Sequence, residues 1–264
     1  MNDGRILAGL DLGHINTKAV IVRGQEILGH CEAATGFEVI AAAQAALDHV
    51  LNNVGVSRAD LSAIVTTGIF RDVVKVPQLS VSSSVPEYVA DARGALFLNK
   101  NSRTVIDIGG NIHKVISYDR KGTLLDVIQN DKCADGLGIF YTSMAKAIGL
   151  SEQELSELAL VSTGDVSVAI QCALSAESEA IDLFCQGMDV ADVTKAVTKF
   201  IGERVAAMST CMPLAQEIVV AGGLAKSEAL VMHLSGLLDK EISVLNLPEY
   251  VGAIGAAISC EGGK

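Results

Sequence analysis

The sequence predicts an α/β protein built as two lobes of one body. Two stretches rich in Val and Ile have the pattern of strand–turn–strand hairpins, one near the N-terminus and one near residue 107, and helical stretches follow the second. No Pro/Ser/Gly-rich segment separates the halves, since residues 98–103 form a short polar turn at most. We therefore expect an N-terminal lobe over residues 1–102 and a C-terminal lobe over residues 103–264.

Composition excludes several classes of protein. The 264-residue chain is 50% apolar and 19% charged, which excludes a disordered chain. A net charge of −11 argues against nucleic acid as a partner, because nucleic-acid binding needs a basic face. No apolar run approaches the ~20 residues that a membrane span needs, so no membrane is expected. The N-terminus carries Asp3 and enters a strand pattern at once, which predicts no signal peptide and a cytoplasmic protein.

The two hairpins, Ile6–Val22 and Arg103–Ser117, share one spacing. In both, an apolar strand ends in Asp, Gly follows two residues later, and Lys stands seven residues after the Asp. The matching sets are Asp11, Gly13 and Lys18 in the first hairpin and Asp107, Gly109 and Lys114 in the second. The alternative is chance similarity between two hairpins of Val/Ile-rich strands.

Such a turn favours phosphate. Glycine lets backbone N–H groups approach an anion closely, and an Asp at the strand end offers the oxygen ligands that magnesium prefers. Two such turns facing each other, one per lobe, would hold a triphosphate from both sides. The sequence lacks GxxxxGK[ST] and GxGxxG, so neither a P-loop nor a Rossmann site is expected. Lys18 and Lys114 could reach phosphates, or could be surface lysines on edge strands.

A third glycine turn follows the apolar strand Ile218–Ala221. Gly222 and Gly223 precede a predicted helix over residues 227–237. This arrangement predicts a cradle for an adenosine.

Three motifs together resemble one superfamily. DLGHINTK, IDIGG and VVAGGLAKS, in that order, are similar to the phosphate-1, phosphate-2 and adenosine motifs of the acetate kinase/sugar kinase/Hsp70/actin superfamily. The resemblance implies an actin-like ATPase with two ribonuclease-H-like lobes, each a mixed β-sheet flanked by helices. It implies that ATP or ADP binds between the lobes, and that the small-residue helix over residues 248–258 connects them.

The superfamily motifs imply roles for particular residues. Asp11 would hold Mg²⁺, and Asp107 would position the attacking water through the metal. The residues expected to contact the nucleotide are Gly13, His14, Asn16, Thr17, Lys18, Gly109, Gly110, Asn111, Gly222, Gly223 and Lys226. His14 stands where Ser or Thr is commoner in this superfamily, which removes a hydroxyl from that position.

The six cysteines form no CxxC pair, so the usual local spacing of a metal site is absent, and most lone cysteines are small buried residues. Cys133 and Cys172 differ from the others because each precedes a predicted helix, over residues 139–148 and 176–186. A helix N-terminus lowers the pKa of a thiol. Two thiolates cannot hold a four-iron cluster, but a twofold dimer would supply four.

The two cysteine segments resemble one branch of the superfamily. NDKCADGLGIF and VAIQCALSAESE are similar to motifs of the BadF/BadG/BcrA/BcrD-type ATPase family, which contains activators of 2-hydroxyacyl-CoA dehydratases and ATP-binding subunits of benzoyl-CoA reductase. The resemblance implies that Cys133 and Cys172 bind a 4Fe–4S cluster shared by a homodimer, or by a heterodimer with a paralogue. It also implies ferredoxin or flavodoxin as electron donor and an iron–sulfur dehydratase or reductase as acceptor.

Some positions depart from this family's pattern. Leu137 and Ile139 replace the usual Thr and Arg, Asn111 replaces Gln, and Asp91 stands where many members have His. Residues 91–99 are more similar to the benzoyl-CoA reductase subunit, whereas the length suits a stand-alone activator. Two other classes stay open: a small-molecule kinase, and a non-catalytic actin-like protein whose cysteines are incidental.

Overall fold

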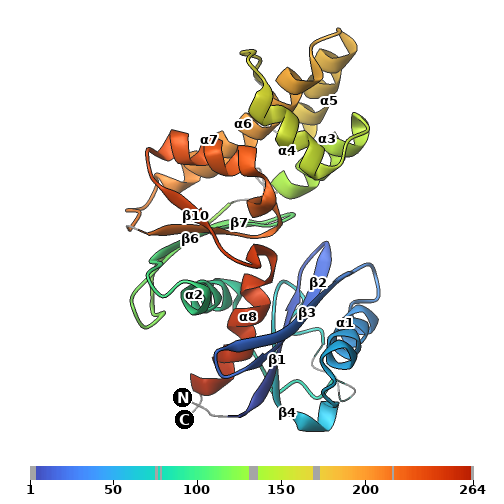
Figure 1. Ribbon diagram of the computed structural model, residues 1–264, viewed down its shortest axis with the longest axis vertical. Helices are drawn as coiled ribbons and strands as arrows, with labels where there is room; N and C mark the ends of the chain where they lie inside the picture. The colour runs from blue at the N-terminus through green and yellow to red at the C-terminus, as the bar shows by residue number, and fades with distance from the viewer. Residues whose placement is uncertain are drawn as a thin grey trace. The chain divides into compact units, whose positions relative to one another are not determined.

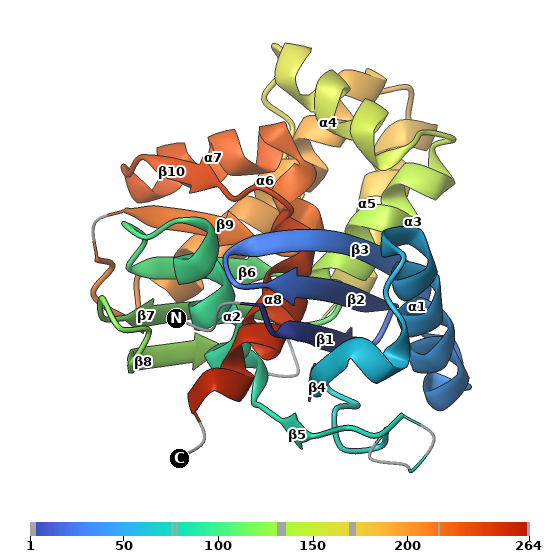
Figure 2. The ribbon, with the colours of Figure 1, turned by 60° about the horizontal axis from the view of Figure 1, so that its bottom comes forward.

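The chain forms two units, each built around a five-stranded mixed sheet (Figures 1 and 2). The computed structural model describes residues 4–74, 77, 79–130, 136–168, 173–215 and 217–262. The first unit contains residues 1–102, 118–125 and 249–264, and the second contains residues 103–117 and 126–248. The chain thus returns twice to the first unit after residue 102.

The sheet of the first unit has the strand order β3-β2-β1-β4-β5. Its first three strands are antiparallel and the last two run parallel to β1. The strands are β1 (Ile6–Leu12), β2 (Asn16–Arg23), β3 (Glu26–Ala34), β4 (Leu61–Thr67) and β5 (Ser83–Ser84). Its helices are α1 (Val39–Val54), α2 (Glu87–Leu98) and α8 (Val251–Ile258), with short 3₁₀ turns at Arg58–Asp60, Pro248–Tyr250 and Ser259–Gly262.

Side-chain alternation along β1 decides which helix covers which face of this sheet. Ala8, Leu10 and Leu12 are buried in one cluster with the apolar residues of α1. The face between them carries Gly9 and Asp11 and packs against α8, on the side opposite α1 (Figure 1). A Cβ at Gly9 would overlap the carbonyl oxygen of Ala253, so glycine is required there for α8 to lie on the sheet.

The sheet of the second unit repeats this plan with the order β10-β9-β6-β7-β8. β6 pairs antiparallel with β7 and parallel with β9. The strands are β6 (Thr104–Ile108), β7 (His113–Tyr118), β8 (Leu124–Gln129), β9 (Ile218–Ala221) and β10 (Ile242–Val244). The helices are α3 (Leu137–Ala147), α4 (Glu152–Val161), α5 (Ala173–Cys185), α6 (Val190–Ser209) and α7 (Glu228–Leu238), with a 3₁₀ turn at Gly223–Lys226.

Helices α4 and α6 of the second unit start at side-chain caps, and the helices of this unit share one apolar core with its sheet. Ser151 and Glu154 form a reciprocal capping box at the start of α4, and Asp189 caps α6 by accepting from the Ala191 N–H. The rings of Phe140 on α3 and Phe200 on α6 meet edge to face, 5.3 Å apart. Local capping therefore sets where these helices begin, and aromatic packing holds two of them together.

The predicted elements are confirmed with shifts of one to three residues at the ends of the helices. The helix predicted over residues 176–186 is α5, which begins at Ala173, and the helix predicted over 227–237 is α7. The predicted class, two mixed sheets each flanked by helices, is confirmed. The division at residue 102 into two continuous lobes stays a prediction. Within the described ranges, every helix is too short or too polar to cross a lipid bilayer.

Candidate functional site

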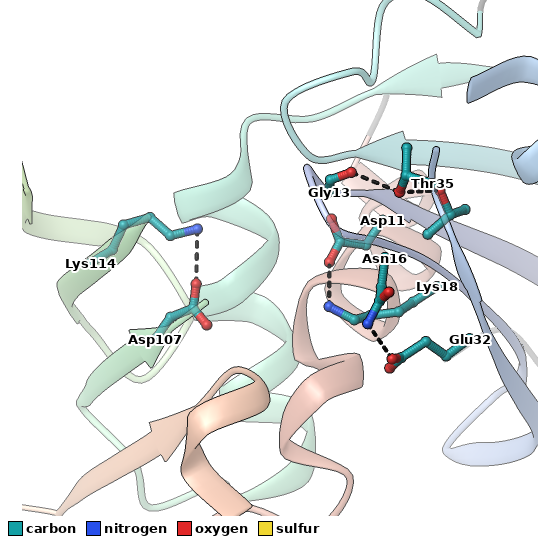
Figure 3. A network of polar contacts seen from close by, with 9 residues as sticks. Asp11, Gly13, Asn16, Lys18, Glu32, Thr35, Asp107 and Lys114 are labelled. Carbon is teal, nitrogen blue, oxygen red and sulfur yellow. Dashed lines mark hydrogen bonds and ion pairs between the residues drawn. The ribbon is translucent and has the colours of Figure 1, made fainter. Parts of the chain in front are cut away.

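The turn between β1 and β2 is closed by glycine. Gly13 donates its N–H to the carbonyl oxygen of Asn16 at 3.1 Å, and a Cβ on Gly13 would lie 2.9 Å from that oxygen. Directly below the turn, Asp11 pairs in register with Lys18, whose Nζ lies 3.7 Å from Asp11 Oδ2 (Figure 3). The predicted Asp–Gly–Lys spacing thus brings a carboxylate and an ammonium group together at the base of one turn.

Two polar residues of this turn point to partners within the first unit. Asn16 donates its side-chain amide to Glu32 on β3, and the exposed His14 ring packs edge to face on Phe70 with centroids 5.6 Å apart. Predicted nucleotide contacts by His14 and Asn16 stay predictions. The Phe70 contact orients the imidazole, and the Glu32 contact orients the amide.

Thr35 stabilises this turn by hydrogen bonds, although no motif in the sequence identifies it. Its buried hydroxyl donates to the Gly13 carbonyl at 2.8 Å and lies 3.0 Å from the hydroxyl of Thr17, and its N–H donates to Ile15 (Figure 3). Thr17, predicted as a nucleotide contact, therefore places its side chain inside the unit and in contact with Thr35. Thr35 follows β3 and lies 22 residues from Gly13, so only the strand pairing reveals it.

The turn between β6 and β7 repeats the same geometry. Gly109 donates its N–H to the carbonyl oxygen of Ile112 at 3.0 Å, and Asp107 pairs in register with Lys114 (Figure 3). Lys114 Nζ lies 3.0 Å from Asp107 Oδ2, and the lysine side chain is only 4% exposed. The alternative of a surface lysine is therefore wrong for Lys114.

The first turn of α3 holds the second turn through backbone atoms. Gly136 donates its N–H to Asn111 at 2.8 Å and Ile139 donates to Gly110 at 3.0 Å. A Cβ on Gly138 would lie 2.6 Å from both Gly109 O and Gly110 Cα, so α3 approaches the turn as closely as glycine permits. The helix that follows the Cys133 segment is thus bonded directly to the predicted phosphate turn.

His113 lies beside this turn, opposite Ile108 in the strand pair. It is 1% exposed, and among the described residues its Nδ1 atom meets no hydrogen-bond partner. Burial lowers the pKa of His113 to about 4, against an opposing effect of the Asp107 carboxylate. The imidazole is therefore neutral at pH 7.

The third glycine turn, at Gly222, lies next to the Asp107 carboxylate of the same unit. Gly222 has φ +86° and donates its N–H to Pro248 at 2.9 Å, and a Cβ there would lie 2.6 Å from Asp107 Oδ1. Gly223 begins the 3₁₀ turn that ends at Lys226, beside a groove of about 430 Å³ between α7 and β10. The predicted adenosine motif therefore adjoins Asp107 through Gly222.

The first unit contains a matching turn that the sequence motifs did not predict. Gly68 follows β4 with φ +91°, and a Cβ there would overlap the backbone of Leu12, just as one on Gly222 would overlap Ile108. Both glycines end the strand that runs parallel to the aspartate strand. The sequence signal was weak because residues 66–68 (TTG) and 220–222 (VAG) share only the glycine.

The cysteine predictions fall outside the structural description. Cys133 and Cys172 both lie outside the described residues. Cys31 and Cys260 are half-buried, and Cys185 and Cys211 are exposed. In the described ranges, no three His, Cys, Asp or Glu side chains are grouped so as to hold a metal ion.

The donor atoms fit phosphate and magnesium. Asp11 Oδ2 and Asp107 Oδ1 are carboxylate oxygens beside glycines whose missing side chains keep the nearby space open, at Gly252 and Gly222 respectively. Carboxylate oxygens are the ligands that Mg²⁺ prefers, and glycine turns expose N–H groups to anions. Each unit therefore offers an oxygen ligand and a glycine turn at the end of its central strand.

Comparison with known proteins places the chain in a family. The BadF/BadG/BcrA/BcrD ATPase family matches residues 8–259. The 2-hydroxyisocaproyl-CoA dehydratase activator of Clostridioides difficile is 30% identical over 250 residues, 95% of this chain and 92% of the activator. A benzoyl-CoA reductase subunit of Thauera aromatica is 25% identical over 264 residues, 96% of this chain and 92% of that protein.

A solved structure of a dehydratase activator is also similar to this chain. The activator of the 2-hydroxyisocaproyl-CoA dehydratase from Clostridium difficile with bound ADPNP superposes with a TM-score of 0.89 at 30% identity, covering 96% of this chain and 93% of that one. The fold is therefore that of the actin-like ATPases, as the three glycine motifs predicted. With two matching Asp–Gly–Lys turns on this fold and a family match across almost its full length, the chain belongs to the BadF/BadG/BcrA/BcrD ATPase family.

Proposed function

We propose that this protein hydrolyses ATP to drive low-potential electron transfer to a partner enzyme, as a 2-hydroxyacyl-CoA dehydratase activator or a similar reductase component. The observation that carries the proposal is the Asp–Gly–Lys turn, which occurs in both units with the same register. It stands in a chain that aligns over 95% of its length with a dehydratase activator.

The nucleotide is assigned to the three glycine turns. Backbone N–H groups of the turns at Gly13 and Gly109 bind phosphate oxygens, and residues 222–226 bind the adenosine. Asp11 holds Mg²⁺ through its carboxylate, and Asp107 orients the attacking water. Magnesium, when bound, neutralises charge on the phosphate oxygens.

Lys18 and Lys114 also have a role within their own turns. Each ammonium group lies against the aspartate of its own turn, at 3.7 Å and 3.0 Å. Both lysines therefore hold the aspartate side chains in place, and any phosphate contact is additional.

The electron-transfer part of the proposal depends on sequence motifs. Cys133 and Cys172 supply two thiolates per chain to a 4Fe–4S cluster, and a second chain, identical or paralogous, supplies the other two. The cluster, when bound, provides one-electron chemistry at low potential. A ferredoxin or flavodoxin is the proposed donor, and an iron–sulfur dehydratase is the proposed acceptor.

Anaerobic purification tests this proposal. The protein should be brown with roughly four irons per dimer. Cys133→Ser and Cys172→Ser should each remove the colour, whereas Cys185→Ser, an exposed cysteine outside both motifs, should retain it. A colourless anaerobic preparation would contradict the cluster assignment.

ATP turnover tests the competing class of small-molecule kinases. Turnover should depend on the redox state of the cluster and proceed without a hydroxyl acceptor. Asp11→Asn and Asp107→Asn should each lower it by about 100-fold or more, because the first would weaken the hold on Mg²⁺ and the second would no longer orient the attacking water through a carboxylate. Phosphorylation of an added metabolite by the colourless protein would favour a kinase instead.

A second candidate is the ATP-binding subunit of a benzoyl-CoA reductase-type complex. The benzoyl-CoA reductase relative aligns over 96% of this chain. Purification from the native organism distinguishes the two, because a subunit co-purifies with its complex whereas an activator is isolated apart from its dehydratase.

A further inference from the structure

Three buried hydroxyl groups meet where α3, α4 and the start of α7 come together in the second unit. The Tyr141 hydroxyl on α3 lies 3.0 Å from the hydroxyl of Ser227, which in turn lies 3.2 Å from the hydroxyl of Ser156 on α4. Tyr141 is 1% exposed, and both serines are 4% exposed. A buried hydroxyl needs a hydrogen-bond partner, and these three supply partners to one another, so we call them the hydroxyl chain.

The hydroxyl chain fixes the start of α7. Ser227 precedes this helix and accepts a hydrogen bond from the N–H of Leu230 at 3.3 Å, while Ser156 accepts one from the N–H of Ala229 at 3.1 Å. The N–H groups in the first turn of a helix have no partner within the helix itself. One cap therefore comes from the residue before α7, and the other comes from α4.

Ser227 also ends the glycine turn predicted to bind adenosine. The 3₁₀ turn Gly223–Lys226 leads directly into Ser227, whose N–H donates to the carbonyl oxygen of Leu224 at 3.0 Å. Leu224 and Ala225 of this turn are buried in the apolar core of the second unit. The backbone of the adenosine turn is therefore held at its C-terminal end by the hydroxyl chain.

The other end of the hydroxyl chain is attached to the phosphate turn through α3. Ile139, near the start of α3, donates its N–H to the carbonyl oxygen of Gly110 at 3.0 Å. Tyr141 stands two residues later, and its hydroxyl also lies 3.0 Å from the carbonyl oxygen of Glu152 at the start of α4. Ser227 is 86 residues away from Tyr141 in the sequence. The hydroxyl chain thus joins two glycine turns of the second unit that are distant along the chain.

We infer that the hydroxyl chain sets the spacing between the phosphate turn at Gly109 and the adenosine turn at residues 222–226, so that its three members are positioning residues for the nucleotide. This inference rests on the proposed function, in which both turns bind one nucleotide. ATP contacts both turns at once, whereas inorganic tripolyphosphate lacks the adenosine and depends on the phosphate turns alone. Turns that are already held at the right spacing bind without the cost of ordering them, so the hydroxyl chain favours ATP over the bare triphosphate.

The test compares Tyr141→Phe with Tyr118→Phe. Tyr118 is a matched control because it is also buried and its hydroxyl lies 2.8 Å from that of Ser102, but it stands at the end of β7 opposite the phosphate turn. By isothermal titration calorimetry with Mg²⁺, Tyr141→Phe should bind ADPNP about tenfold more weakly and tripolyphosphate within about twofold of the unmodified protein. Ser156→Ala should act in the same direction, and Tyr118→Phe should leave both affinities unchanged.

Hydrogen exchange of the nucleotide-free protein provides a second readout. Tyr141→Phe should raise the exchange rate of the amides at residues 225–230 by about tenfold, because loss of a buried hydrogen bond favours local opening, and Tyr118→Phe should not. An equal loss of affinity for both ligands, or unchanged exchange in Tyr141→Phe, would overturn the inference. Unmodified protein that binds ADPNP no more tightly than tripolyphosphate would overturn the adenosine assignment in the proposed function, while the exchange comparison still decides whether the hydroxyl chain holds that turn.

Discussion

The turns at Gly13 and Gly109 have the same strand register but differ in what surrounds them. In both, the glycine N–H bonds to a carbonyl three residues later, and Asp pairs with Lys at the base. The pair at Lys18 is partly open to solvent at 3.7 Å, whereas the pair at Lys114 is shorter and nearly enclosed. One local pattern therefore supports two different electrostatic environments.

The supports of the two turns differ as well. A side chain, Thr35, holds the first turn, while backbone groups of α3 hold the second. At the equivalent strand position, the hydroxyl of Thr17 meets Thr35, whereas Nδ1 of His113 is buried without a hydrogen-bond partner among the described residues. The comparison indicates that the second turn responds more strongly to changes in charge and packing, which four measurements can examine.

The largest expected effect comes from the lysines. Lys114→Met should lower the free energy of unfolding by about 3–5 kcal/mol, because it takes the ammonium partner from the largely buried Asp107 carboxylate. Lys18→Met should cost about 1 kcal/mol or less, since its pair is more exposed. Urea denaturation of both variants measures the difference, and equal losses would show that the two pairs are equivalent.

The pH dependence of the free energy of unfolding should come from His113 in the second unit. The pKa of His113 is about 4 when folded and near 6.5 when unfolded, so the unfolded chain binds the proton first as pH falls. Stability from the neutral imidazole is complete above pH 6.5 and is lost between pH 6.5 and 4. His113→Leu should therefore remove about 3 kcal/mol of acid sensitivity in this window, measured as the difference in unfolding free energy at pH 7 and pH 4. An unchanged pH profile would contradict the assigned burial of the ring.

The turn supports give smaller effects. Gly138→Ala should cost about 2 kcal/mol, because its Cβ would press on the backbone of Gly109 and Gly110, which must shift. Gly138→Ala should also weaken the binding of an ATP analogue, and isothermal titration calorimetry measures that loss of affinity.

A helical glycine in open space provides the control for that variant. Gly236→Ala on α7 meets nothing within 4 Å and should be neutral or stabilising by up to about 1 kcal/mol. If Gly138→Ala behaves like Gly236→Ala, the contact between α3 and the turn is not tight.

The smallest effect belongs to the first turn. Thr35→Val removes one hydrogen-bond donor from Gly13 and should cost about 1 kcal/mol, with a modest loss of nucleotide affinity. Thr35→Ser retains the hydroxyl and should restore both values. Failure of the serine variant to recover affinity would mean that the methyl group, rather than the hydroxyl, supports the turn.

Local patterns in the sequence were enough to predict both turns and the elements around them. Strand alternation, a glycine and a seven-residue spacing place Asp11 opposite Lys18 and Asp107 opposite Lys114, because an antiparallel hairpin determines that register by itself. Helix starts at Ser151, Asp189 and Ser227 follow from capping chemistry within three residues.

Contacts between distant parts of the chain needed the tertiary structure. Thr35 meets Gly13 from 22 residues away, and Asp192 meets Gly164 from 28 residues away, so neither has a local signal in the sequence. The burial of Lys114 and the closeness of Gly138 to Gly109 also result from the packing of whole elements. Backbone register is a short-range property, whereas burial and support depend on which elements pack together, and only folding brings those elements into contact.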